Sequence, residues 1–101
     1  MKMIYCTGNI EILEDFHETL EEQGVENYQI IDRVLAQSEN SQPRFDTPVW
    51  PGYNFSVLIQ VKDNERAKSL IKLINNFNTD ASRDSELITY CSWSLEKFGV
   101  D

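Results

Sequence analysis

This chain of 101 residues contains four strand-like runs and two stretches of helical periodicity, and their order limits the folds open to it. The strand-like runs span residues 2–6, 28–35, 55–61 and 87–95, where apolar and β-branched residues are dense. The third run is the clearest, because its residues at 55, 57, 59 and 61 are all apolar and alternate with Ser56, Leu58 and Gln60. This period of two predicts a strand with one buried face.

The two stretches between the strands have the spacing of amphipathic helices. A capping Asn9 precedes the first, Gly24 follows it as a stop signal, and Asp63 or Asn64 is expected to cap the second. The apolar stripes are Ile10, Leu13, Phe16, His17 and Leu20 in the first helix, and Ala67, Leu70, Ile71, Ile74 and Phe77 in the second.

The order βαββαβ predicts an α+β ferredoxin-like plait, in which a four-stranded antiparallel sheet carries both helices on one face. The other face then has no helical cover. Alternation along the last strand places Tyr90 and Trp93 on opposite faces, so we expect one of them to pack in an interface between subunits. We predict one domain over residues 1–101, with a long loop at 37–54 between the second and third strands.

The loop at 37–54 is the main functional candidate. Neighbouring strands are usually joined by about two to five residues, and a much longer connection is commonly functional or disordered. Disorder is disfavoured by the segment Pro48-Val49-Trp50-Pro51-Gly52, because two prolines fix the backbone around a large aromatic side chain.

Composition excludes several classes of function. The net charge of −8 argues against nucleic acid and against insertion into anionic membranes. No apolar run approaches the roughly 20 residues of a membrane-spanning helix, and the N-terminal run is too short for a signal peptide. We therefore expect a cytoplasmic protein.

Metal and cofactor binding also find little support. Cys6 and Cys91 are the only cysteines, and both fall in strand-like runs where small reduced core residues are expected. His17 is the only histidine, so one subunit offers few ligands for a zinc site. His17 could still share a metal with Glu14, Glu18 and Glu21 on the first helix, although packing at the helix boundary is the commoner role. We expect no cofactor and no intrinsic metal site.

Enzymatic function is not expected either. No Ser or Cys has a His base near it in sequence, and the chain has no glycine-rich phosphate loop. Acylphosphatases share the plait, but the segment Thr7-Gly8-Asn9 has no arginine beside it to complete their anion cradle.

Together with this element order, the segment Val49-Trp50-Pro51-Gly52 resembles the PII-like (GlnB-like) superfamily of small trimeric signalling proteins. A divergent subgroup of that superfamily carries Val-Trp-Pro-Gly before strand three, as here. The resemblance covers essentially the whole chain at the level of element order. It implies a homotrimer with its sheets packed in a central core, small molecules bound in clefts between subunits, and a long loop that contacts a protein partner.

The chain also departs from the pattern of the nucleotide-binding members, which carry a glycine-rich basic segment after the second helix. Here residues 78–86 contain no glycine, and Arg83 is their only cation. The tyrosine-centred modification motif of the nitrogen-regulatory members is absent, because no Tyr lies between Gln37 and Trp50. The ligand and the partner are therefore left open.

The resemblance and the position of the loop nominate Arg44, Phe45, Asp46, Trp50 and Tyr53 as ligand or partner residues. Arg44 could hold a carboxylate or another anion through its planar fork, or could instead pair with Asp46 or face water. Trp50 could cover a planar ligand or anchor the loop.

These features support three hypotheses of function. The first is a PII-like regulatory protein that binds a small molecule or ion at the intersubunit clefts of a trimer and signals through residues 37–54. The second is a divalent-metal-binding tolerance protein of the CutA type, which shares the trimeric plait. The third is a structural trimeric assembly domain.

Overall fold

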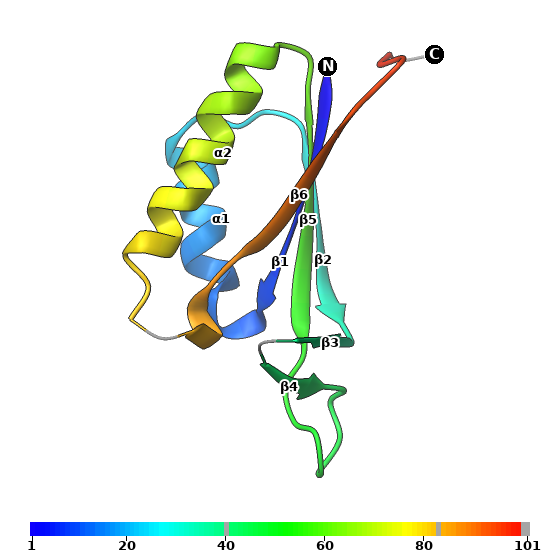
Figure 1. Cartoon of the computed structure of the whole chain (residues 1–101), viewed down its shortest axis with the longest axis vertical. Coiled ribbons are helices and arrows are strands. Elements are labelled where there is room, and N and C mark those ends of the chain that lie inside the picture. Colours follow the sequence, from blue (N-terminus) through cyan, green and yellow to red (C-terminus); the bar gives the residue numbers. More distant parts are fainter. Residues whose placement is uncertain (40, 83, 100–101) are drawn as a thin grey trace.

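The computed structural model describes residues 1–39, 41–82 and 84–99 (Figure 1). Within these residues the strands are β1 (Lys2–Asn9), β2 (Tyr28–Val34), β3 (Ala36–Ser38), β4 (Ser41–Arg44), β5 (Asn54–Val61) and β6 (Thr89–Ser94). The helices are α1 (Leu13–Glu22) and α2 (Asn64–Thr79), and the short 3-10 segments are η1 (Ile10–Ile12) and η2 (Asp84–Glu86).

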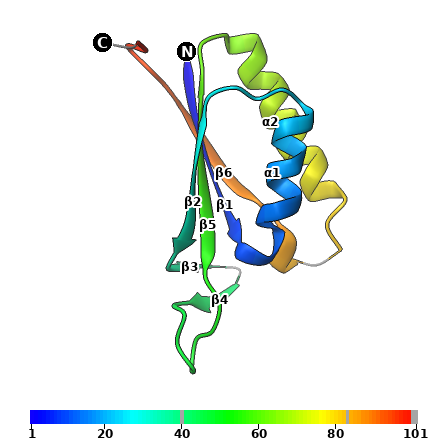
Figure 2. The same cartoon turned by 180° about the vertical axis from the view of Figure 1, so that it is seen from behind.

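The main sheet has four strands in the order β2-β5-β1-β6, and every neighbouring pair is antiparallel. Both α-helices cover the same face of this sheet, as the two opposite views show (Figures 1 and 2). The α+β ferredoxin-like plait predicted from the order of patterns is therefore confirmed.

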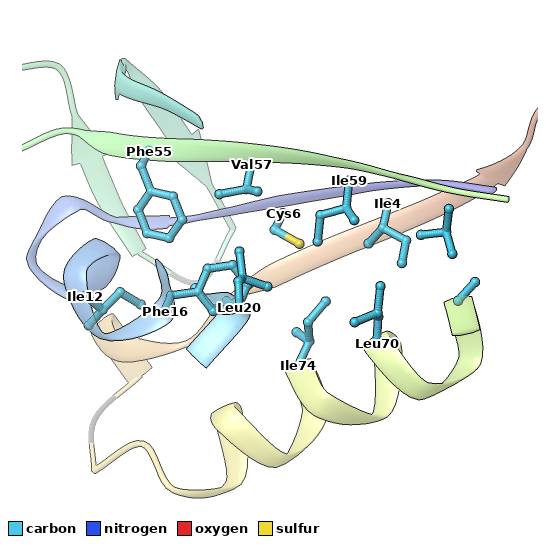
Figure 3. Close-up of a cluster of buried hydrophobic side chains, with 13 residues drawn as sticks. Ile4, Cys6, Ile12, Phe16, Leu20, Phe55, Val57, Ile59, Leu70 and Ile74 are labelled. Carbon is cyan, nitrogen blue, oxygen red and sulfur yellow. The ribbon is translucent and has the colours of Figure 1, made fainter. Parts of the chain in front are cut away.

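The core lies between the sheet and the two helices. Figure 3 shows Ile4 and Cys6 of β1 and Phe55, Val57 and Ile59 of β5 directed toward helix side chains. The fully buried helix residues in this cluster are Phe16, Leu20 and Ile74. The apolar alternation of β5 and the stripes of both helices thus meet as the sequence pattern indicates.

The expected helix ends are confirmed in detail. The side chain of Asn9 accepts a hydrogen bond of 3.1 Å from the amide of Glu11, and Asp63 accepts one of 3.0 Å from the amide of Glu65. Gly24 adopts a φ of 69°, the left-handed conformation that glycine reaches without steric cost. The first helix differs from the expected one only because its first turn, η1, is a 3-10 helix that precedes α1.

The strand ends differ from those expected. β1 continues past Cys6 to Asn9, because Thr7, Gly8 and Asn9 pair with Ser56, Phe55 and Asn54 of β5. Gly8 suits this close packing, since a Cβ there would lie 2.9 Å from Cδ1 of Ile88. The last strand is shorter than 87–95 and begins at Thr89, after the 3-10 segment η2 and the buried Ile88.

The face without helices carries apolar side chains at its centre and at both edges. Tyr5 and Leu58 are paired in register at the centre, and Trp93 on β6 and Ile31 on β2 are 45% and 48% exposed. Tyr90 packs on the opposite, helix-covered side with the core, so Trp93 is the aromatic residue of β6 on the uncovered face.

The expectation that Cys91 is a core residue is wrong. Cys6 is buried, but Cys91 is exposed because it pairs with Tyr5 on the uncovered face of an edge strand. The two thiols lie on opposite faces of the sheet, and both are free.

The connection expected to be a loop at 37–54 contains regular structure. β3 and β4 form a small antiparallel ribbon beyond the end of the main sheet (Figure 1). The sequence pattern does not predict this ribbon. Its two strands have only three and four residues, and they show no clear alternation of apolar and polar side chains.

Candidate functional site at the end of the sheet

The candidate site is a cavity of about 680 Å³ where the β3–β4 ribbon meets the end of the main sheet. Four parts of the chain form its walls: the end of β1, the ribbon itself, the first residue of β5, and the segment from Ser85 to Thr89. Hydroxyl groups are frequent in the lining, at Thr7, Ser38, Ser41, Ser85 and Thr89. Such a lining offers hydrogen bonds to a polar ligand.

Arg44 belongs to the wall of this cavity and is the last residue of β4. Its Nη1 donates a hydrogen bond of 2.8 Å to Oδ1 of Asn54, which is 7% exposed at the start of β5. Nδ2 of Asn54 in turn donates to Oγ1 of Thr7 at 3.4 Å, and Thr7 donates to the carbonyl of Phe55 at 2.9 Å. This chain of hydrogen bonds fixes Arg44 relative to β1 and β5.

A second cavity, of about 360 Å³, shares Ser41, Arg44 and Ser85 with the first. Its other lining residues include Pro43 and Pro51, so the Pro48–Gly52 segment reaches this space. Arg44 therefore stands between a cavity rich in hydroxyl groups and one bordered by two proline rings.

Residues 45–52 form a closed turn. The amides of Phe45 and Thr47 both donate to the carbonyl of Trp50, at 3.2 and 3.0 Å, and the amide of Trp50 donates to Oγ1 of Thr47 at 2.9 Å. Gly52 closes the turn with a φ of 82° and accepts from the amide of Asp46 at 2.9 Å. The prolines of this segment thus accompany an ordered turn, as their rigidity suggests.

The tip of this turn presents apolar side chains to solvent. Val49 is 75% exposed and Trp50 is 38% exposed. Phe45, at the start of the turn, is half-buried. Exposed apolar residues on a closed turn at the far end of the molecule are suited to contact another protein (Figure 1).

Asp46 forms an ion pair with Arg33 of β2, and Arg44 has a different partner. The expected alternative of an Arg44–Asp46 pair is therefore wrong. The guanidinium carbon of Arg33 also lies 5.1 Å from the centre of the Tyr53 ring. Two of the five nominated residues, Asp46 and Tyr53, thus meet at an arginine outside the loop.

Sequence reasoning missed Arg33, Asn54 and Thr7, which hold the nominated residues in place. Each lies in or next to a strand-like run, where polar residues are read as the solvent face of the strand. No sequence signal marks Asn54, because residues such as Asn and Gly commonly border strands. Arg83, the cation expected after the second helix, lies outside the described residues.

The side chain of Asn78 in α2 holds the segment that follows the helix. Nδ2 of Asn78 donates to the carbonyl of Ile88 at 2.8 Å, and Oδ1 of Asn78 accepts from the amide of Ile88 at 2.7 Å. This pair of bonds resembles strand pairing. It positions Ser85 and Leu87 in the wall of the larger cavity.

Metal ligands do not gather in residues 1–39, 41–82 and 84–99, where no group of three or more His, Cys, Asp or Glu side chains could hold an ion. His17 lies on α1 with its Nε2 2.9 Å from the hydroxyl of Tyr28 and 3.0 Å from Oε1 of Glu21. Its ring packs edge-on against Tyr28, which is the boundary packing role expected for this residue. Among the described residues, no helix is long and apolar enough to cross a membrane.

The chain matches no model of a known protein family and no curated protein sequence. Solved structures are similar to it in fold. The structure of CPII from Thiomonas intermedia K12 bound to ADP and bicarbonate has a TM-score of 0.63 at 12% identity, over 95% of this chain and 88% of CPII. The apo form of CPII, a nitrogen regulatory PII-like protein, has a TM-score of 0.59 at 14% identity, over 91% and 87% of the two chains.

A PII-like signalling protein from Thermus thermophilus is similar as well, with a TM-score of 0.58 at 15% identity over 91% of this chain and 83% of that protein. At such low identity the likeness is one of fold. It agrees with the resemblance in element order found in the sequence. The chain has the fold of the PII-like signalling proteins.

Proposed function

We propose that this chain is a PII-like regulatory protein that binds a small ligand at the end of its sheet and signals its occupancy through residues 37–54. One observation carries the proposal: Arg44 lines both cavities and immediately precedes the closed turn at 45–52. A ligand bound at Arg44 therefore lies next to the start of the segment that presents Val49 and Trp50, and can change the conformation of that segment.

Arg44 gives both cavities a positive charge that favours a small anion, while the carboxylate of Glu39 also lines the larger cavity. The guanidinium of Arg44 uses Nη1 for Asn54, and its remaining N–H groups can bind a carboxylate, bicarbonate or phosphate. CPII has been solved with ADP and bicarbonate. Because residues 78–86 here carry no glycine, a compact oxyanion suits this site better than a nucleotide held by a glycine-rich cradle.

We further propose that the working unit is a homotrimer, with the ligand in clefts between subunits. Support comes from the uncovered sheet face, where Tyr5, Ile31, Leu58 and Trp93 form an apolar surface on one subunit. An apolar face of this kind is stabilised by burial against another copy. The cavity lies at the end of the sheet, next to this face.

Isothermal titration calorimetry tests ligand binding. Bicarbonate, acetate, AMP, ADP and ATP are titrated into the protein, and divalent cations are titrated separately as a test of the CutA-type alternative. We expect an anion to bind the wild type and to bind Arg44→Ala at least about ten-fold more weakly, because a charged hydrogen bond is lost.

Lys72→Ala is the matched control, since it removes an exposed positive charge from α2, away from both cavities. The proposal is contradicted if no anion binds, or if both variants lose affinity equally. A heat signal from divalent cations alone would support the CutA-type alternative. No binding of any kind by a stable trimer would support the structural assembly domain.

A further inference from the structure

Arg33 contacts the residues at both ends of the turn. It lies in β2, within the stretch where the register between β2 and β5 shifts. Its guanidinium pairs with Asp46, the second residue of the turn, and lies over the ring of Tyr53, which follows Gly52. A single side chain of the main sheet thus holds the chain where it enters the turn and where it leaves.

The backbone conformation of Asp46 links its ion pair with Arg33 to the closure of the turn. Its φ of 55° is in the left-handed region, which few residues other than glycine adopt, although Asp and Asn tolerate it. In that conformation its amide donates to the carbonyl of Gly52, so the side chain pairs with Arg33 while the backbone closes the turn. Loss of the pair removes one of the forces that keep this conformation populated.

We propose that the Arg33–Asp46 pair is a latch that holds the turn at 45–52 closed, and that opening the latch frees Val49 and Trp50 to rearrange around a partner. The side chains of Arg33 and Asp46 are 62% and 33% exposed, so water and salt reach the pair and it can open readily. Asp46 lies two residues after Arg44. The regulatory use of the latch rests on the proposed function, because a ligand bound at Arg44 is what would shift Asp46.

Amide hydrogen exchange measured by NMR on the unliganded protein tests the latch. The reporters are the amides of Phe45, Asp46 and Thr47, which donate the closing bonds of the turn. The variants are Arg33→Gln, Asp46→Asn and the double variant. Asn preserves the tolerance for positive φ, so Asp46→Asn removes the charge without adding backbone strain.

Asp32→Asn is the matched control, because it removes an equal charge from the neighbouring exposed position of β2. We expect exchange at the three reporter amides to rise roughly three-fold or more in each single variant, and to rise little further in the double variant. Exchange in β1 and β5 should not change, which shows that the fold is intact.

Equal exchange in the wild type and all variants would overturn the latch, since the turn would then be held by its own backbone bonds. Equal increases in Asp32→Asn would overturn it too. These measurements need no ligand, so they stand whether or not an anion binds. Failure of the anion titration with a positive exchange result would remove the proposed ligand and leave the latch in place.

Discussion

Nη1 of Arg44 donates a hydrogen bond of 2.8 Å to Oδ1 of Asn54, and this bond joins the end of β4 to the start of β5 across the turn. Asn54 is buried at this point and continues the network to Thr7 of β1. A loop residue that faces ligand space is in this way fixed by the sheet, which gives it one orientation before any ligand arrives.

Replacement of Asn54 by Ala is expected to release Arg44 and destabilise the protein by about 1–3 kcal/mol, because buried polar groups lose their partners. Anion affinity should fall together with stability. Urea denaturation and calorimetry measure the two effects. Asn76→Ala, at an exposed position of α2, serves as the control and should lower neither, because Ala is a better helix former than Asn. Wild-type affinity in Asn54→Ala would show that Arg44 needs no such support.

Asn78 is expected to stabilise the wall of the larger cavity. Asn78→Ala removes both hydrogen bonds to the backbone of Ile88, and its cost should be about 1–3 kcal/mol because those backbone groups are part-buried. Asn78→Asp keeps the bond from the Ile88 amide but places a carboxylate oxygen, which cannot donate, against the Ile88 carbonyl, so it should lose stability as well. Thermal unfolding compares the melting temperatures of the two variants with that of the wild type. Equal melting temperatures for Asn78→Ala and the wild type would contradict this role.

The fold was predictable because several short-range sequence patterns specify the same strands and helices. The alternation of β5, the two apolar stripes, and the caps at Asn9 and Asp63 are each short-range patterns that agree with one another. Cys91 was assigned to the wrong environment for a related reason. Alternation separates the two faces of a strand, but it does not say that one of those faces has no cover.

The site was predictable only in part. The unusual length of the connection and its Pro-Val-Trp-Pro-Gly segment drew attention to Arg44, Asp46 and Tyr53. Asp46 and Tyr53 contact Arg33 of β2, and Arg44 contacts Asn54 of β5. These are tertiary contacts, and no spacing in the sequence specifies them. The cavities themselves depend on the placement of the segment after α2, which is set by Asn78.

Leu58→Glu tests whether the uncovered face joins subunits. Leu58 is paired with Tyr5 at the centre of that face, and a buried carboxylate there would oppose assembly. Native mass spectrometry should find a trimer for the wild type and a monomer for the variant, with the circular dichroism of the fold retained. Val49→Glu, an equal change at the 75% exposed tip of the turn, should remain trimeric. A monomeric wild type would contradict the proposed assembly.

Cys6 should make the protein less stable as the solution becomes alkaline. Burial between sheet and helices, with a smaller effect of Cys91, raises the pKa of the Cys6 thiol from 9.0 to about 12. The unfolded chain therefore loses this proton from about pH 9, while the folded chain keeps it until near pH 12. The stabilisation is complete below pH 9 and is lost as the pH rises through this range.

The stability difference between wild type and Cys6→Ala isolates this effect, because the two proteins share every other ionisable group. Cys6→Ala removes the thiol at a cost in packing that does not depend on pH. The advantage of the wild type in urea denaturation should shrink by up to about 1 kcal/mol per pH unit above pH 9. Parallel curves for the wild type and Cys6→Ala between pH 8 and pH 10.5 would show that the Cys6 thiol ionises as freely in the folded protein as in the unfolded chain.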